Sequence, residues 1–290
     1  MTIAPAPSGP VTRVAYLGTP RLAVTPLRAL AAAGIEVALV VSQPDRRRGR
    51  GSAVVASPVK QAALDLGLPV SDEVAEVAEV GVDLAVVVAF GRLIGRPVLE
   101  AVPMVNLHFS LLPRWRGAAP VERAILAGDT HTGVDLMAVE EALDTGGIYR
   151  RREVRIGPND TLDHLRTTLT HEGTAMLVEE LQRGLGVATP QQGEATYAAK
   201  ITPEERQLRW QDSAATVHRV VRLGGAWTTH NGKRLKVWAT HVPPRGDGPV
   251  VAAGDGPVEL VEVQPEGKAP MAARAWANGA RWRPGDGLGS

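Results

Sequence analysis

"VTRVAYLGTPRLAVTPLRALAAAGIEVALVVS", residues 11–42, decides the fold class. Two short apolar runs, 11–18 and 35–42, flank a segment of helical character that closes on Gly34, a typical helix C-cap. Strands this apolar are buried on both faces, and a helix between two of them indicates a parallel pair. The stretch therefore predicts a strand–helix–strand unit that opens an α/β domain.

Further runs extend this pattern along the chain. "VDLAVVVAF" (82–90) and "MVNLHFS" (104–110) predict two more buried strands, and "TGVDLMAVE" (132–140) and "GGIYRRREVRIG" (146–157) predict another two joined by a loop. Residues 161–184 predict a long closing helix that Asp160 or Thr161 caps. We expect a doubly wound parallel sheet, covered on both faces, with its ligands beyond the carboxyl ends of the strands.

The hydrophobic pattern of the sequence changes after Gly184. Residues 185–208 have no sustained period and are typical of a linker. Beyond them "RLKVWATHV" (234–242), "GPVELVEVQ" (256–264) and the region around "RAWANGARW" (274–282) predict short strands of a small β-barrel over 209–290. Five of the six tryptophans follow residue 209, where we expect mainly core positions, although some could face a partner.

Composition excludes several classes of protein. The net charge of +1 leaves only local basic patches for nucleic acid. The absence of cysteine excludes disulfides, thiolate metal sites and a cysteine nucleophile. No apolar run reaches a membrane span of about 18 residues. Residues 1–11 are typical of a disordered leader and do not resemble a signal peptide. A cytoplasmic protein, which we expect to be a monomer, fits these bounds.

Polar residues alternate at the end of one predicted strand. Asn106, His108 and Ser110 share one face of that strand, since alternate residues point the same way. An asparagine amide can stabilise a developing oxyanion, and a histidine can relay a proton near neutral pH. From the pattern alone, a structural histidine satisfied within the core is the more common case.

A carboxylate in a later loop changes that balance. Asp144 stands in "LDTGG" (143–147), a sequence that favours neither helix nor strand. It could orient the His108 imidazole and stabilise its protonated form, or it could only bond its own loop backbone in an Asx-turn. The residues themselves leave both interpretations open.

The stretch "NLHFSLLPRWRGAAPVERAILAGDTHTGVDLMAVEEALDTGG" (106–147) resembles the methionyl-tRNA formyltransferase family. "YLGTP", "SQPDRRRGRG", "ASPVKQAA", "VVVAFGRLIG", "ATYAAKI" and "NGKRLKVW" follow in the family's order, so the resemblance covers nearly the whole chain after about residue 12. It implies an N-terminal Rossmann-like doubly wound formyltransferase domain over 12–184 and a C-terminal OB-like β-barrel domain over 209–290. The Asn-x-His-x-Ser-Leu-Leu-Pro and Leu-Asp-Thr-Gly elements are shared by folate-dependent formyltransferases, and "PRWRGAAP" and Pro-Asp-Arg narrow the match to tRNA.

This resemblance implies a reaction. A primary amine attacks the formyl carbon of 10-formyltetrahydrofolate, the co-substrate, and no metal is needed. Asn106 and His108 would face the oxyanion, and His108 and Asp144 would serve proton transfer. Two segments would form the folate pocket. The first is the stretch 90–93, with Phe90, Gly91 and Leu93 around Arg92, and the second consists of Ser110, Leu111, Leu112 and Pro113.

The same resemblance implies a tRNA-binding loop. In "QPDRRRGRGS" (43–52) the inserted loop would contact the acceptor end, because arginines on a Gly-rich loop can contact phosphates and unpaired bases, although a run of charges is usually only solvated. The candidate tRNA contacts of the loop and the barrel are Arg46, Arg47, Arg48, Arg50, Lys233, Arg234 and Lys236. The run Arg150–Arg152 stays unassigned, because alternation places Arg151 opposite its neighbours.

The chain departs from the family pattern in three places. "RLGGAWTTHNGK" (222–233) lacks the family's Pro-x-Pro-Gly-Ala segment, "VPPRGDGPVVAAGDG" (242–256) is compressed, and Gly147 stands at an often acidic position. The alternatives are a formyltransferase for a nucleotide-linked amino sugar and an inactive module that only binds tRNA or folate. The first would not need the arginine loop, and the second would not need Asn106, His108 and Asp144 together.

Overall fold

The computed structural model describes residues 4–47, 54–283 and 285–289. The chain forms two compact units. The first comprises residues 1–120, 131–155 and 166–198, and the second comprises 121–130, 156–165 and 199–290. The domain boundaries expected at 184/185 and 208/209 stay predictions.

A mixed sheet of seven strands forms the centre of the first unit, in the order β10-β9-β7-β6-β1-β2-β5. The five strands from β7 to β5 are parallel, whereas β9 is antiparallel to both β7 and β10. The expected parallel sheet thus comprises five strands, and β9 and β10 add an antiparallel edge to it. The connection 139–147 between β9 and β10 is too short for the crossover that a parallel pair needs. The strands are β1 (Arg13–Gly18), β2 (Glu36–Val41), β5 (Val70–Ser71), β6 (Leu84–Val88), β7 (Met104–His108), β9 (His131–Ala138) and β10 (Ile148–Arg155).

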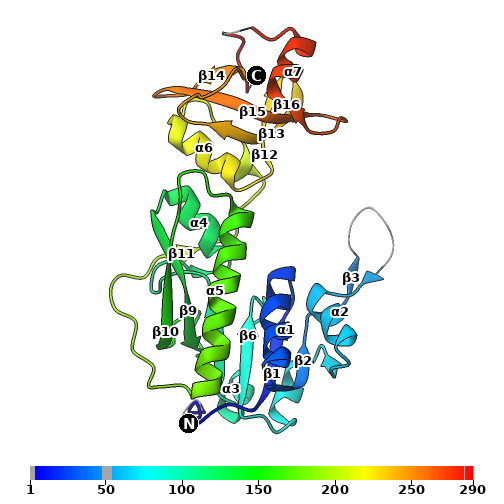
Figure 1. Cartoon of the computed structure of the whole chain (residues 1–290), viewed down its shortest axis with the longest axis vertical. Coiled ribbons are helices and arrows are strands. Elements are labelled where there is room, and N and C mark those ends of the chain that lie inside the picture. The colour runs from blue at the N-terminus through cyan, green and yellow to red at the C-terminus, as the bar shows by residue number, and fades with distance from the viewer. Residues whose placement is uncertain (1–3, 48–53, 284, 290) are drawn as a thin grey trace. The chain divides into compact units, whose positions relative to one another are not determined.

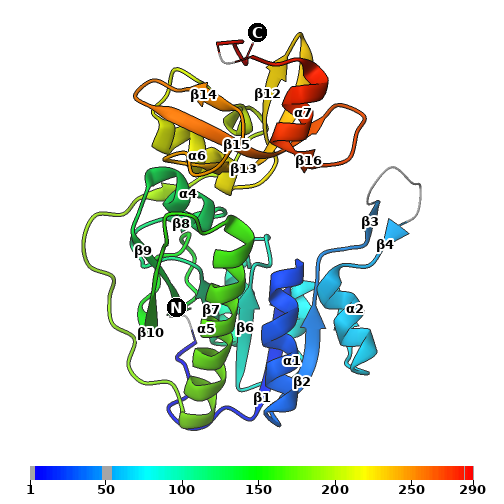
Figure 2. The ribbon, with the colours of Figure 1, turned by 45° about the horizontal axis from the view of Figure 1, so that its top comes forward.

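Helices cover both faces of this sheet. On β1, Val14 and Tyr16 join one core cluster, and the alternate residues Ala15 and Leu17 join another. The first cluster contains buried residues of α1 (Val24–Ala32), α2 (Pro58–Asp65) and α5 (Leu162–Arg183). The second is closed by η2 (Val74–Ala78) and α3 (Arg96–Ala101). Figures 1 and 2 show α1 and α5 on the same side of the sheet. The prediction of a doubly wound domain is confirmed.

The helix termini follow the sequence signals. The short η1 (Arg21–Ala23) leads into α1, and the chain leaves this helix at Gly34. The φ of Gly34 is 78°, the left-handed conformation typical of a helix C-terminus. Ser57 caps α2 by accepting from the Lys60 amide at 3.0 Å. At α5 the hydroxyl of Thr161 accepts from the His164 amide at 3.2 Å, so Thr161 is the cap.

Two further segments belong to the first unit. Residues 4–11, expected as a disordered leader, run along it: the Ala4 amide donates to the Leu99 carbonyl at 3.1 Å, and Val11 is buried. After β2 the chain forms an antiparallel pair, β3 (Arg46–Arg47) with β4 (Val54–Val55), which stands away from the sheet (Figure 2). No helix in the described part of the chain is both long enough and apolar enough to cross a membrane.

The second unit is an antiparallel sheet with helices packed on it. Its order is β12-β13-β15-β14, with β16 on β15. A core that includes Val217, Val237, Leu260 and Trp276 joins the sheet to its helices. The elements are α4 (Pro120–Ala127), η3 (Glu204–Arg206), α6 (Ala214–Arg222), β12 (Ala226–His230), β13 (Lys233–His241), β14 (Val250–Ala252), β15 (Pro257–Pro265), β16 (Met271–Ala272) and α7 (Ala273–Ala280).

The prediction of a strand around "RAWANGARW" is wrong, because these residues form α7. Four alanines in eight residues favour a helix, and the buried Ala273 and Trp276 are three positions apart, on one helical face. The compressed stretch before β15 is held by Glu259, whose carboxylate accepts from the amides of Arg245, Gly246 and Gly248 at 2.8–3.0 Å.

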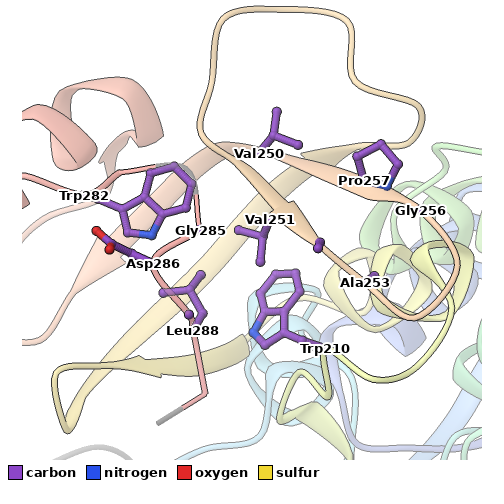
Figure 3. A pocket seen from close by; sticks show the side chains of 12 residues that line it. Trp210, Val250, Val251, Ala253, Gly256, Pro257, Trp282, Gly285, Asp286 and Leu288 are labelled. Atoms are coloured by element: carbon purple, nitrogen blue, oxygen red, sulfur yellow. The ribbon is translucent and has the colours of Figure 1, made fainter.

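The tryptophans of this unit divide between core and surface. Trp276 is buried, and Trp210 and Trp282 pack against the same core. Trp210 and Trp282 also line a hollow of about 540 Å³, together with Val251 and Leu288 (Figure 3). By contrast, Trp238 on β13 is 38% exposed. The expectation of mainly core positions holds for three of the five.

Candidate active site

β7 brings Asn106 and His108 to the carboxyl edge of the first unit's sheet. Both neighbouring strands pair with Asn106, through Val87 of β6 and Met137 of β9. Asn106 is half-buried and His108 is 5% exposed. Within the described residues the Asn106 side chain forms no hydrogen bond, which leaves its amide available to a ligand.

The imidazole of His108 lies between two oxygen atoms. Its Nε2 is 3.0 Å from the Trp115 carbonyl oxygen, and its Nδ1 is 3.6 Å from Oδ2 of Asp144. Both neighbours are acceptors, and the Nε2 contact is within hydrogen-bond distance, whereas Asp144 is an ion-pair partner for a protonated ring. The contact with Asp144 is the one that the sequence left open.

Asp144 does more than bond its own loop. Its Oδ2 accepts from the Gly117 amide at 2.7 Å, which joins the 139–147 loop to the turn after β7. Its φ of 51° is in the left-handed region, as are those of Ala89 (46°) and Trp115 (65°). Residues other than glycine seldom adopt this conformation, and such residues cluster at functional sites.

An ion pair holds the turn between His108 and Trp115. Asp135 of β9 is fully buried, and its Oδ2 accepts from the Leu112 amide at 2.8 Å. Arg151 of β10 donates from Nε to Oδ1 and from Nη2 to Oδ2, each at 2.7 Å, and also to the Leu112 carbonyl. Burial raises the pKa of Asp135, while Arg151 and the Leu112 amide oppose that rise.

The structure separates the residues of the predicted folate segments by exposure. Ser110 and Leu112 are buried, and the Ser110 hydroxyl donates to the Arg114 carbonyl at 2.6 Å. Leu111 and Pro113 are half-buried. In the other segment Phe90 is buried, whereas Gly91 is exposed and Leu93 is 84% exposed. Ser110 and Leu112 therefore shape the turn, Phe90 is part of the core, and Gly91, Leu93, Leu111 and Pro113 offer surface.

The Phe90 segment is tied to two neighbouring strand ends. The Phe90 carbonyl accepts from Thr19 Oγ1 at 3.1 Å and from Gln43 Nε2 at 2.8 Å. Gly91 has a φ of 75°, and a Cβ there would be 2.9 Å from Gln43 Nε2. The backbone at this position is thus fixed from the ends of β1 and β2.

The predicted basic residues lie in three places. Arg46 and Arg47 form β3, whereas Arg48 and Arg50 lie outside the described residues. Lys233, Arg234 and Lys236 lie on β13. Arg150 and Arg152 face Glu residues of α5 and Arg151 faces Asp135, as the alternation predicted. In the described ranges, no three His, Asp or Glu side chains group as metal ligands would.

Sequence reasoning missed several residues of the site. The carbonyl of Trp115, the amide of Gly117 and the pair Asp135–Arg151 are among them. Asp135, the one carboxylate in the otherwise apolar run 133–139, was a usable signal, because a buried charge needs a partner. Gln191, whose side chain donates to the Asp144 and Gly146 carbonyls, gave no such signal.

Two formyl transferase family models match this chain. The family model described as "Formyl transferase" matches residues 12–181, and "Formyl transferase, C-terminal domain" matches 200–281. Methionyl-tRNA formyltransferase of Symbiobacterium thermophilum is 41% identical over 300 residues, covering 92% of each chain. That of Jannaschia sp. is 44% identical over 299 residues, covering 94% of this chain and 98% of the relative.

Solved structures show the same fold. The N-formyltransferase from Helicobacter canadensis, in complex with folinic acid and dTDP-3-aminofucose, has a TM-score of 0.66 and 16% identity, over 86% of this chain and 99% of that one. HypX from Aquifex aeolicus in complex with tetrahydrofolic acid has a TM-score of 0.64 and 18% identity, over 91% of this chain and 46% of that one. From the two matched models and the curated relatives, the chain belongs to the formyl transferase family and, within it, to the methionyl-tRNA formyltransferases.

Proposed function

We propose that this chain transfers the formyl group of 10-formyltetrahydrofolate to the free amino group of methionyl-tRNA. The observation that carries the proposal is the juxtaposition of Asn106, His108 and Asp144 in a chain whose relatives are methionyl-tRNA formyltransferases over more than nine-tenths of its length. We expect the reaction in the cytoplasm, with the enzyme acting as a monomer.

The reaction conserves atoms and charge without a further reactant. The amine nitrogen forms a bond to the formyl carbon, whose carbonyl oxygen gains negative charge. The bond from that carbon to N10 of the folate then breaks, and the proton released by the amine ends on N10. The protein must stabilise the oxyanion and move one proton.

Each of the three residues has one part in this scheme. The uncommitted Asn106 amide donates to the oxyanion. The His108 ring, with the Asp144 carboxylate at 3.6 Å on one side, carries the proton from the amine towards N10. Asp144 orients the ring and offsets its positive charge while the proton is held.

Exposed residues at the sheet edge suit the folate. The pterin is flat and carries amide-like donors and acceptors, which pair with backbone groups and pack on apolar side chains. Leu93 is 84% exposed and Leu143 is 53% exposed, at the start of one ligand loop and next to Asp144 in the other. We assign the pocket to Phe90, Gly91 and Leu93 with Leu111 and Pro113, and give Ser110 and Leu112 the role of shaping the turn.

The tRNA would contact two surfaces. We assign its acceptor end to the loop that carries Arg46, Arg47, Arg48 and Arg50. On β13 the side chains of Arg234, Lys236 and Trp238 alternate outward, with Arg234 4.0 Å from the Trp227 ring and Lys236 5.7 Å from the Trp238 ring. Basic groups interleaved with aromatic rings suit a nucleic-acid backbone with accessible bases. This face, together with the exposed Lys233 at the start of β13, is our second tRNA contact.

A labelling experiment tests the function. The protein is incubated with formyl-labelled 10-formyltetrahydrofolate and charged initiator tRNA. We expect the wild-type protein to label the tRNA and His108→Ala to label it far less. His171→Ala should label it as the wild type does, because the His171 side chain is 82% exposed on α5. Label on a nucleotide-linked amino sugar and none on tRNA would refute the proposal, and label on neither would favour an inactive binding module.

A salt series tests the loop. Replacing Arg46, Arg47, Arg48 and Arg50 with alanine should weaken tRNA use and flatten its salt dependence, because each lost phosphate contact removes counterion release. Use of a small amine substrate should not change. Normal tRNA formylation by this variant at every salt concentration would remove the loop from the tRNA site.

A further inference from the structure

A ten-residue strap, residues 189–198, runs along both loops of the active site. Thr189 pairs with Ile148 through two backbone hydrogen bonds of 2.8 and 2.9 Å, immediately after the 139–147 loop. At its other end β11 (Tyr197–Ala198) pairs in parallel with β8 (Arg116–Gly117), in the turn after β7. The strap lies within the stretch that the sequence predicted as a linker, and it belongs to the first unit.

Gln191 connects the strap to the Asp144 loop. Its Nε2 donates to the Asp144 carbonyl at 2.8 Å and to the Gly146 carbonyl at 2.9 Å. Its Oε1 accepts from Arg116 Nε at 3.1 Å and from Nη2 at 2.7 Å. Arginine can only donate and carbonyls only accept, so these four contacts admit one orientation of the amide.

Thr196 connects the strap to the turn after β7. Its hydroxyl accepts from the Trp115 amide at 2.9 Å, and its own amide donates to the Pro113 carbonyl at 3.2 Å. Its carbonyl accepts from the Arg116 amide at 2.8 Å. Trp115 has a φ of 65° and presents its carbonyl oxygen to His108 Nε2 at 3.0 Å.

The two contacts converge on His108 from opposite sides. Gln191 holds the backbone of Asp144, whose carboxylate faces Nδ1, and Thr196 holds the backbone of Trp115, whose carbonyl faces Nε2. Both held residues have left-handed φ values, a conformation that persists only where the surroundings impose it. The imidazole forms no hydrogen bond with Gln191 or Thr196. Their influence on the ring therefore passes through the Asp144 carboxylate and the Trp115 carbonyl oxygen.

We infer that Gln191 and Thr196 are positioning residues for the formyl transfer, and that the strap 189–198 is part of the active site. This inference rests on the proposed function. The two side chains bind no substrate; they set the distance and direction of the two oxygens that orient the ring. Misplacing a catalytic group by about 1 Å can cost about 100-fold in rate, so their loss should lower kcat.

Two pairs of variants test the inference. Gln191→Met keeps the length of the side chain and removes its donors and acceptor, and Gln192→Met makes the same change at the exposed neighbour. Thr196→Val keeps the shape and removes the hydroxyl, and Thr196→Ser restores it. We expect kcat to fall about 10- to 100-fold for Gln191→Met and Thr196→Val, with KM for tRNA and folate within about twofold, and near wild-type rates for Gln192→Met and Thr196→Ser.

The ring resonances of His108, assigned with His108→Ala, give a readout that needs no activity. They should shift in Gln191→Met and Thr196→Val and stay in place in the two controls. If the wild type transfers no formyl group, the proposed function fails, and the resonances still decide whether Gln191 and Thr196 position the His108 ring. Unchanged resonances and kcat, a loss confined to KM, or a Thr196→Ser as slow as Thr196→Val would each overturn the inference.

Discussion

Removing Arg151 should destabilise the first unit in a way that depends on pH. Arg151 makes two charge-assisted hydrogen bonds of 2.7 Å to the fully buried Asp135. Two such bonds contribute about 3–6 kcal/mol before screening. The Arg151 side chain is 41% exposed, so solvent weakens the ion pair. Without Arg151, the Asp135 carboxylate can also bind a proton, which removes the cost of an unpaired buried charge. For Arg151→Met we expect a loss of about 2–3 kcal/mol at pH 7, below the about 3–5 kcal/mol of a fully buried pair.

The sign of the pH dependence follows from the pKa of Asp135. Burial already raises that pKa in the folded protein, and losing Arg151 removes the main group that lowers it. Asp135 therefore binds a proton more tightly in the folded variant than in the unfolded chain. The contribution of Asp135 to the variant's stability is greatest below the unfolded pKa of about 3.9 and falls as the pH rises through the folded pKa.

Urea unfolding of wild type and Arg151→Met at pH 7 and pH 5 measures the effect. The difference in unfolding free energy should be smaller at pH 5. Asp135→Asn combined with Arg151→Met removes the orphaned charge at constant size and should recover part of the loss at pH 7. An equal loss at both pH values, or a double variant no more stable than Arg151→Met, would contradict this account of the pair.

Three further outcomes are expected. Asn106→Ala should lower kcat about 10²- to 10³-fold, since it removes one oxyanion donor; a change under threefold in single-turnover rate would rule out that role. Gly146→Ala should inactivate the enzyme without unfolding it, because its Cβ would lie 2.0 Å from the Ala138 carbonyl oxygen and displace the Asp144 loop; circular dichroism and kcat together check this. Burial lowers the pKa of His218, so its contribution to stability is present above about pH 6.5 and is lost as the pH falls towards the folded pKa. His218→Gln should flatten the melting temperature between pH 7 and pH 5, and an unchanged slope would refute it.

The sheet and most of its helices could be predicted because local pattern and tertiary environment agree there. Continuous apolar runs such as 84–88 need burial on both faces, and only a sheet between helices supplies it. The prediction failed where several structures satisfy the same pattern. An Ala-rich stretch with a Trp suits a strand or a helix by periodicity, and packing of Trp276 in the second core decided for α7.

The candidate catalytic residues could be predicted from the sequence where residue type and spacing alone indicate their role. Asn106 and His108 share a strand face whatever lies around them, and Asp144 stands in a loop that cannot be helix or strand. Whether Asp144 reaches the imidazole depends on how β7 and β9 pair, so only the folded chain could answer with a Nδ1–Oδ2 distance of 3.6 Å. Gln191 and Thr196 carry no local signal, since their role consists of hydrogen bonds to backbone groups 45–81 positions away. The identity of the reacting groups is thus local information, whereas the contacts that orient them are long-range and exist only once the sheet has brought the loops together.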